Sequence, residues 1–101
     1  MNKLEAAYAK YLDSREDVLK WQFESHKLRL ADRTFYTPDF GVLVQQPDGS
    51  AVFEFHEVKG FWEDDARVKI KVAAETHWMF KFIAVKAVAK KRGGGWTVED
   101  F

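Results

Sequence analysis

The chain has 101 residues, which is enough for one domain around a single hydrophobic core but not for an accessory domain. Hydrophobic residues make up 47% of it and cysteine is absent, so we expect a folded protein without disulfides, thiolate zinc sites or cysteine nucleophiles. Sixteen basic and sixteen acidic residues cancel, which excludes a simple polycationic binder of nucleic acid. No apolar run approaches the roughly 20 residues that span a bilayer, and the N-terminus is polar and amphipathic rather than a secretory signal. We therefore expect an intracellular, cytoplasmic protein without a membrane partner.

The first predicted element is a helix over residues 2–14. Apolar side chains recur there at helical spacing, and Asn2 followed by Glu5 is typical of a capping box at a helix N-terminus. Residues 21–23 and 28–30 then alternate as half-buried strands do, with a bend between them.

A β-hairpin is predicted next. Residues 34–44 are rich in aromatic and β-branched side chains, and residues 51–58 are again strand-like. Between them, residues 46–49 have the sequence Gln-Pro-Asp-Gly, which has strong turn chemistry. The two strands are therefore expected to pair antiparallel.

The rest of the chain predicts a helix and two further strands. Acidic residues suit the N-terminal dipole of a helix from about residue 63 to residue 78, and apolar side chains line one of its faces. Residues 80–88 are typical of a buried strand, and a short strand-like segment over residues 96–98 follows a glycine run. This order predicts a single α/β domain over residues 1–101, with a central mixed sheet flanked by helices.

The hairpin brings acidic side chains together. Glu57 and Lys59 are two residues apart on a strand and so share a face. If the turn sets Gln46 opposite Ser50, residues whose numbers sum to about 96 face one another, and Asp39 lies opposite Glu57 with β-carbons roughly 5 Å apart. Two carboxylates at that separation repel unless a proton or a cation lies between them. A Mg²⁺ ion resolves the conflict, because it accepts one or two carboxylates and keeps several waters.

The segment Pro38-Asp39-Phe40, followed by Glu57-Val58-Lys59-Gly60, resembles the signature of the PD-(D/E)xK nuclease superfamily. In both, the first acid begins a hairpin, the second acid and the lysine end its partner strand, and a helix and a strand follow. The resemblance covers nearly the whole chain. The length of the chain is similar to that of the small phage-encoded and archaeal Holliday-junction resolvases and endonucleases.

That resemblance implies a restriction-endonuclease-like core that hydrolyses phosphodiester bonds in branched DNA with Mg²⁺, for which Mn²⁺ can substitute, and that works as a homodimer. Asp39, Glu57 and Glu5 would be the metal ligands, and Lys59 would stabilise charge or orient the attacking water. Glu5 has the alternative role of helix cap. The corresponding alternatives for the other acids are a turn cap at Asp39 and an exposed ion pair between Glu57 and Lys59.

Basic residues follow the motif in two groups. Arg67, Lys69 and Lys71 fall on the second predicted helix, and Lys90, Lys91 and Arg92 precede the glycine run. Either group could contact the phosphates of DNA, or simply form a solvated surface.

Other charged residues are predicted to be structural. Glu54 falls on the opposite strand face from Glu57 and is expected to be solvent-facing or salt-bridged. His26, His56 and His77 lack a metal-binding spacing and are interpreted as structural or surface residues.

These observations predict a metal-dependent DNA endonuclease, and a Holliday-junction resolvase in particular. Three alternatives stay open. The first is another nuclease of the same fold, such as a nickase, a restriction-type or an end-processing enzyme. The second is a DNA- or protein-binding module without activity, and the third is a structural interaction domain.

Overall fold

A five-stranded mixed sheet forms the centre of the protein, for which a computed structural model describes residues 1–101. Its strand order is β1-β4-β5-β6-β7. The strands are β1 (Val18–Phe23), β4 (Phe40–Gln45), β5 (Ala51–Lys59), β6 (Lys81–Ala87) and β7 (Trp96–Asp100). Only β5 and β6 pair in parallel, and helix α2 (Asp64–Thr76) forms the crossover between them. The predicted α/β class with a mixed sheet and flanking helices is confirmed, and the sheet places β5 at its centre.

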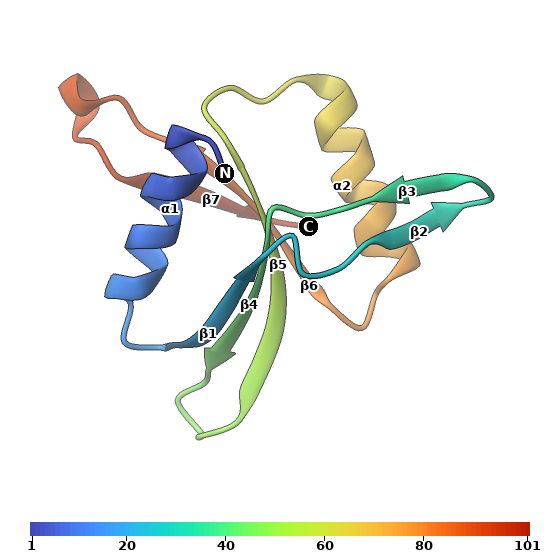
Figure 1. Ribbon diagram of the computed structural model, residues 1–101, viewed down its shortest axis with the longest axis horizontal. Coiled ribbons are helices and arrows are strands. Elements are labelled where there is room, and N and C mark those ends of the chain that lie inside the picture. Colours follow the sequence, from blue (N-terminus) through green and yellow to red (C-terminus); the bar gives the residue numbers. More distant parts are fainter.

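Helix α1 (Lys3–Ser14) covers one face of this sheet (Figure 1). Asn2 and Glu5 form the predicted capping box, in which each side chain accepts a hydrogen bond from the other residue's backbone N–H. The buried side of the helix packs Tyr8, Ala9 and Leu12 against apolar residues of the four strands β4, β5, β6 and β1. This contact supplies the burial that a 12-residue helix needs, because helices of that length are marginal alone in water.

Helix α2 and a small second sheet cover the opposite face. Strands β2 (Leu28–Ala31) and β3 (Thr34–Tyr36) form this two-stranded antiparallel sheet. Its inner side chains pack with Ile70 and Ala73 of α2 against phenylalanines of β5 and β6. The main sheet is thus buried on both faces, which explains the long apolar runs of its central strands.

The β4–β5 hairpin has the predicted register. The paired residues run from Phe40 opposite His56 to Gln45 opposite Ala51, so every pair sums to 96. At the turn, the Gln46 N–H donates to the Ser50 carbonyl at 2.7 Å, and Gly49 has the positive φ of 88° that favours glycine. The turn and the two-residue period of the strands together set this register.

The prediction of one continuous strand over residues 34–44 is wrong. The chain leaves the small sheet after Tyr36 and enters the main sheet at Phe40, so the segment forms β3 and β4 in different sheets. Pro38 lies in the break, and its lack of an N–H prevents it from extending a ladder between two neighbours. The last strand is also longer than predicted, since β7 continues to Asp100.

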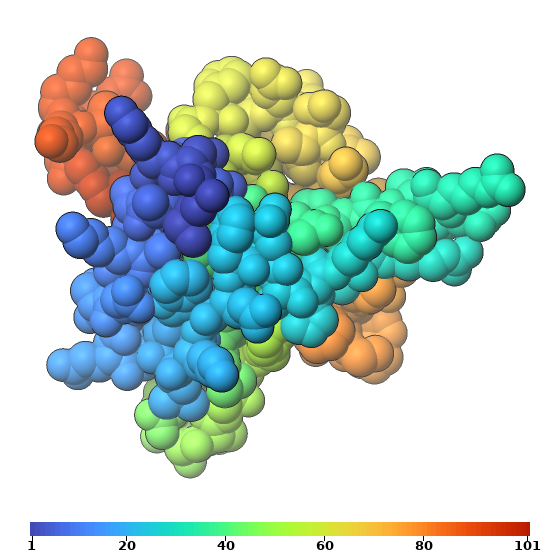
Figure 2. Space-filling view, in the orientation of Figure 1, coloured from blue at the N-terminus to red at the C-terminus, as the bar shows by residue number.

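The molecule measures 41 × 34 × 22 Å along its principal axes. The β2–β3 hairpin projects from one side of it as an arm (Figures 1 and 2). Neither helix is long and apolar enough to cross a membrane.

Candidate functional site

Asp39 and Glu57 meet at the end of the β4–β5 hairpin. Asp39 directly precedes the paired segment, and its backbone N–H donates to Glu57 Oε1 at 3.1 Å. In return, the backbone N–H of Val58 donates to Asp39 Oδ2 at 2.8 Å. Each acid is therefore oriented by the strand that carries the other one, which is the juxtaposition that the register predicts.

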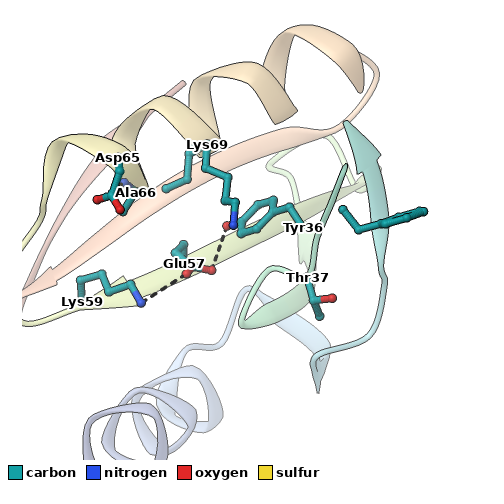
Figure 3. A pocket seen from close by; sticks show the side chains of 9 residues that line it. Tyr36, Thr37, Glu57, Lys59, Asp65, Ala66 and Lys69 are labelled. Carbon is teal, nitrogen blue, oxygen red and sulfur yellow. Dashed lines mark hydrogen bonds and ion pairs between the residues drawn. The ribbon is translucent and has the colours of Figure 1, made fainter. Parts of the chain in front are cut away.

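Two further side chains hold Glu57. The Tyr36 hydroxyl, reaching from β3, donates to Glu57 Oε1 at 2.8 Å. Lys59 Nζ lies 3.6 Å from the other carboxylate oxygen, Oε2. Figure 3 shows both contacts converging on Glu57 between β5 and α2. Glu57 is thus oriented on one oxygen by neutral donors and faces a cation with the other.

The two acids bind protons more tightly than ordinary carboxyls. Burial, and next the negative charge of Glu57, raise the pKa of Asp39 to about 7. Burial also raises the pKa of Glu57, although the Tyr36 hydrogen bond and Lys59 act against this. Burial and the Glu57 charge together raise the pKa of Tyr36, which keeps its hydroxyl a donor. The pair carries less than its full negative charge near neutral pH unless a cation balances it.

A cavity of about 420 Å³ opens beside Glu57 and Lys59 (Figure 3). Side chains from β3, β5 and α2 line it. They are Phe35, Tyr36, Thr37, Glu57, Lys59, Asp65, Ala66, Lys69 and Ile70. Asp39 is 9% exposed and does not line the cavity. The cavity has the size of a small-ligand or nucleotide site.

Glu5 has the capping role in this structure. Its Oε1 accepts the Asn2 N–H at 2.8 Å, and no group of three or more acidic, histidine or cysteine side chains is arranged to hold a metal ion. Its charge nevertheless contributes to the raised pKa of Asp39. Glu5 therefore acts on the acid pair through its field while its carboxylate caps α1.

The donor set of Asp39 and Glu57 fits a hard divalent cation. Both side chains offer carboxylate oxygens, and Asp39 Oδ1 has no hydrogen-bond partner in the protein. Mg²⁺ is held by one or two carboxylates and retains waters, so two acids suffice. A cation bound here would also remove the repulsion that raises the pKa of Asp39.

The basic residues of α2 differ in whether they lie at the cavity. Lys69 lines the cavity, and Lys71 is exposed on the helix surface. Arg67 instead forms a two-pronged ion pair with Glu99 of β7, with distances of 2.7 and 2.8 Å. Arg67 is thus neutralised away from the cavity, whereas Lys69 is available beside it.

Lys90, Lys91 and Arg92 form the exposed 3-10 helix η1 (Lys90–Arg92) after β6. Because β6 runs parallel to β5, with Lys86 paired to Lys59, η1 leaves the sheet at the same end as the site. The crossover between β5 and β6 fixes the position of this group relative to the acids, and the residues of the group alone do not indicate it.

Six residues of the cavity wall were not predicted as site residues: Phe35, Tyr36, Thr37, Asp65, Ala66 and Ile70. Tyr36 orients Glu57, and Phe35 and Asp65 line the cavity wall. The signal that could have found Tyr36 is Pro38, because a proline favours the end of a strand and so places Tyr36 at a strand end close to Asp39.

A second acidic group lies on the opposite face of β5. Glu54 is 5% exposed and accepts a hydrogen bond from His56 Nε2 at 2.8 Å, while Nδ1 of the same ring lies 2.6 Å from the Tyr8 hydroxyl. Lys81 Nζ also lies 4.0 Å from Glu54. The salt-bridged alternative for Glu54 and the structural role of His56 are confirmed; the solvent-facing alternative is wrong, because α1 covers this face.

Comparisons of the chain with models of protein families, with curated proteins and with solved structures find no match.

Proposed function

We propose that this protein is a metal-dependent DNA endonuclease and that its preferred substrate is a four-way junction. The observation that carries the proposal is the cross-strand pair of Asp39 and Glu57, with Lys59 beside it. Asp39 is buried and Glu57 is half-buried; both are hydrogen-bonded into fixed orientations and raised in pKa, and Glu57 faces an open cavity. Perturbed acids at a cavity are typical of catalytic sites.

Asp39 and Glu57 would hold Mg²⁺ or Mn²⁺ through the oxygens that face away from their backbone donors. A cation bound there supplies an activated water and neutralises the scissile phosphate. Tyr36 fixes the orientation of Glu57 through its 2.8 Å hydrogen bond. Lys59, whose side chain is 42% exposed, can reach a phosphate oxygen and stabilise the negative charge that develops during attack.

Basic side chains support an anionic polymer as the substrate. Lys59 and Lys69 line the cavity, and Lys86 is paired with Lys59 at the same end of the sheet. The exposed residues of η1 extend this basic surface beyond the sheet. A backbone of phosphates can contact several of these cations at once, which a small anion cannot.

The preference for branched DNA and the homodimer rest on the resemblance to the PD-(D/E)xK superfamily. A two-fold dimer would present two sites, which suits paired cuts across a junction. Other nucleases of this fold and a DNA-binding module without activity are the alternatives that the experiment separates.

The test is cleavage of a labelled four-way junction beside a matched linear duplex and single strand, in Mg²⁺, Mn²⁺ or EDTA. Wild type is compared with Glu57→Gln and with Glu75→Gln, which removes an exposed acid of α2. We expect symmetric cuts in the junction that require the metal and disappear only in Glu57→Gln. Equal cutting of all three substrates would retain the nuclease and refute junction preference, and DNA binding without any cutting would refute the nuclease.

A further inference from the structure

We propose that Phe35, with Lys27 and Arg29, forms a platform on the β2–β3 arm that stacks an unpaired DNA base beside the cavity. If the protein is the proposed nuclease, the platform contributes to its choice of substrate, and this part of the inference rests on the proposed function. It predicts that the enzyme holds an unstacked nucleotide of the branched substrate next to the scissile phosphate.

The first observation is an aromatic ring that stays largely open to solvent although the hairpin could have buried it elsewhere. Phe35 is 45% exposed, on a strand only three residues long. Its neighbour Tyr36 points the other way and is 8% exposed in the core. Because successive strand residues face opposite sides, the arm has an apolar inner face and a separate outer face that carries Phe35.

Cations frame this ring. Lys27 Nζ lies 4.6 Å from the centroid of Phe35, within the range of a cation–π contact. Arg29 is the cross-strand partner of Phe35, and its side chain is 65% exposed. An exposed ring with two cations beside it on the arm offers a stacking surface for a base together with contacts for the neighbouring phosphates.

The arm presents this surface in a fixed orientation. Its inner side chains Leu28 and Tyr36 pack with Ile70 of α2. The imidazole of His77, at the end of α2, donates to the Arg29 carbonyl at 2.7 Å. The outer face is therefore held by contacts on the opposite side of the arm, and base stacking would not require the arm to unfold.

Phe35 also borders the candidate active site. Phe35 lines the same cavity as Glu57, Lys59 and Lys69. A strand of DNA with one base stacked on Phe35 could extend its phosphates along Lys69 toward Glu57. Duplex DNA would not fit this arrangement equally well, because its bases stack on one another and leave no face for the ring.

Charge favours single-stranded DNA as the occupant of this surface. Lys27, Arg29 and Arg33 outnumber the one acid of the arm, Asp32, which lies 3.7 Å from Arg29. Arg33 is exposed at the tip, with a positive φ of 54°. A polyanion with exposed bases complements both the cations and the aromatic ring, whereas an apolar partner would complement the ring alone.

The experiment measures binding of a single-stranded oligonucleotide that contains 2-aminopurine, in EDTA, where no cleavage occurs. A matched duplex is titrated in parallel. Phe35→Ala should weaken single-strand binding about 5- to 150-fold, the range expected for one base–aromatic stack, and should reduce the change in 2-aminopurine fluorescence. Phe35→Trp should restore both. Arg29→Ala should lower the salt dependence of binding by about one phosphate contact.

Leu19→Ala is the matched control, because Leu19 is 52% exposed on β1, in the other sheet. It should bind as wild type. The platform is refuted if Phe35→Ala binds single strands as wild type does, if duplex binding falls as much as single-strand binding, or if Phe35→Ala changes only the oligomeric state. Because this assay needs no cleavage, Phe35-dependent binding by a protein that cuts nothing would refute the nuclease and keep the platform. Cleavage by a protein whose DNA binding does not depend on Phe35 would refute the platform and keep the nuclease.

Discussion

The acids on the two faces of strand β5 lie in opposite electrostatic surroundings. On the α1 face, Glu54 is hydrogen-bonded to His56, whose ring is in turn bonded to Tyr8, and all three are buried. On the α2 face, Glu57 lies beside a second acid, Asp39, and opens to a cavity. The first acid has a basic partner, whereas the second is set against a like charge and balanced only by the partly exposed Lys59.

The difference separates acids that hold the fold from acids available for chemistry. Breaking a buried, fully partnered group is costly, because the remaining polar atoms lose their hydrogen bonds without gaining water. Two carboxylates of like charge instead destabilise the folded state by repulsion, and removing one of the charges relieves it. Variants on the two faces should therefore affect different properties, stability on one and metal-dependent activity on the other.

The largest effect is expected from Asp39→Asn. Asparagine keeps an oxygen that can accept the Val58 N–H but removes the charge that a cation requires. We expect cleavage to fall by at least about 1,000-fold, equivalent to about 4 kcal/mol in the barrier, while thermal stability in EDTA is not lowered. Single-turnover kinetics measures the rate of cleavage, and thermal unfolding measures the stability. Cleavage within tenfold of wild type would contradict the role of Asp39.

Glu54→Ala should have the reverse profile. It leaves His56 and Lys81 without their carboxylate in a buried site, and we expect a loss of about 3–5 kcal/mol in the free energy of unfolding. Urea denaturation measures this loss, with the exposed Glu75→Ala as a control that should change stability by less than about 0.5 kcal/mol. Equal stability of the two variants would show that the buried group does not hold α1 against β5.

Tyr8→Phe tests the same group more gently. It removes only the hydroxyl and leaves Nδ1 of His56 unpartnered, which should cost about 1–3 kcal/mol. The matched change Tyr11→Phe, at a ring that is 41% exposed on the same helix, should be nearly neutral. If both variants unfold at the same urea concentration, the Tyr8 hydrogen bond contributes nothing to stability.

A further prediction concerns the pH dependence of stability without metal. The pKa of Asp39 is raised from 3.8 to about 7, so the folded state binds a proton more tightly than the unfolded state. The stability that this contributes is present in full below about pH 4 and is lost as the pH rises through about 7. Denaturation of wild type and Asp39→Asn in EDTA should therefore show wild type losing stability relative to the variant across this window. Parallel curves would mean that the acid pair does not share a proton.

The hairpin and its acid pair could be predicted because local rules decide them. The turn at residues 46–49 and the strand period of two place Asp39 opposite Glu57 without reference to the rest of the chain. The capping box of α1 is equally local, since Asn2 and Glu5 are three residues apart.

Contacts between distant segments could not be predicted in this way. Tyr8 and His56 are 48 residues apart, and their hydrogen bond depends on how α1 lies on the sheet. The ion pair between Arg67 and Glu99 likewise forms because β7 pairs with β6 beside α2. The break at Pro38, which sends β3 to a second sheet, was readable in principle, but the aromatic run around it favoured one strand.

We propose above all that Asp39 and Glu57 bind a divalent cation together. The most direct test of this claim is a titration with Mn²⁺, in which free Mn²⁺ is followed by electron paramagnetic resonance, for wild type, Asp39→Asn, Glu57→Gln and the control Glu75→Gln. We predict that wild type and Glu75→Gln bind Mn²⁺ and that each of the other two variants loses this binding. Undiminished binding in Asp39→Asn and Glu57→Gln, or no binding by wild type, would contradict the claim.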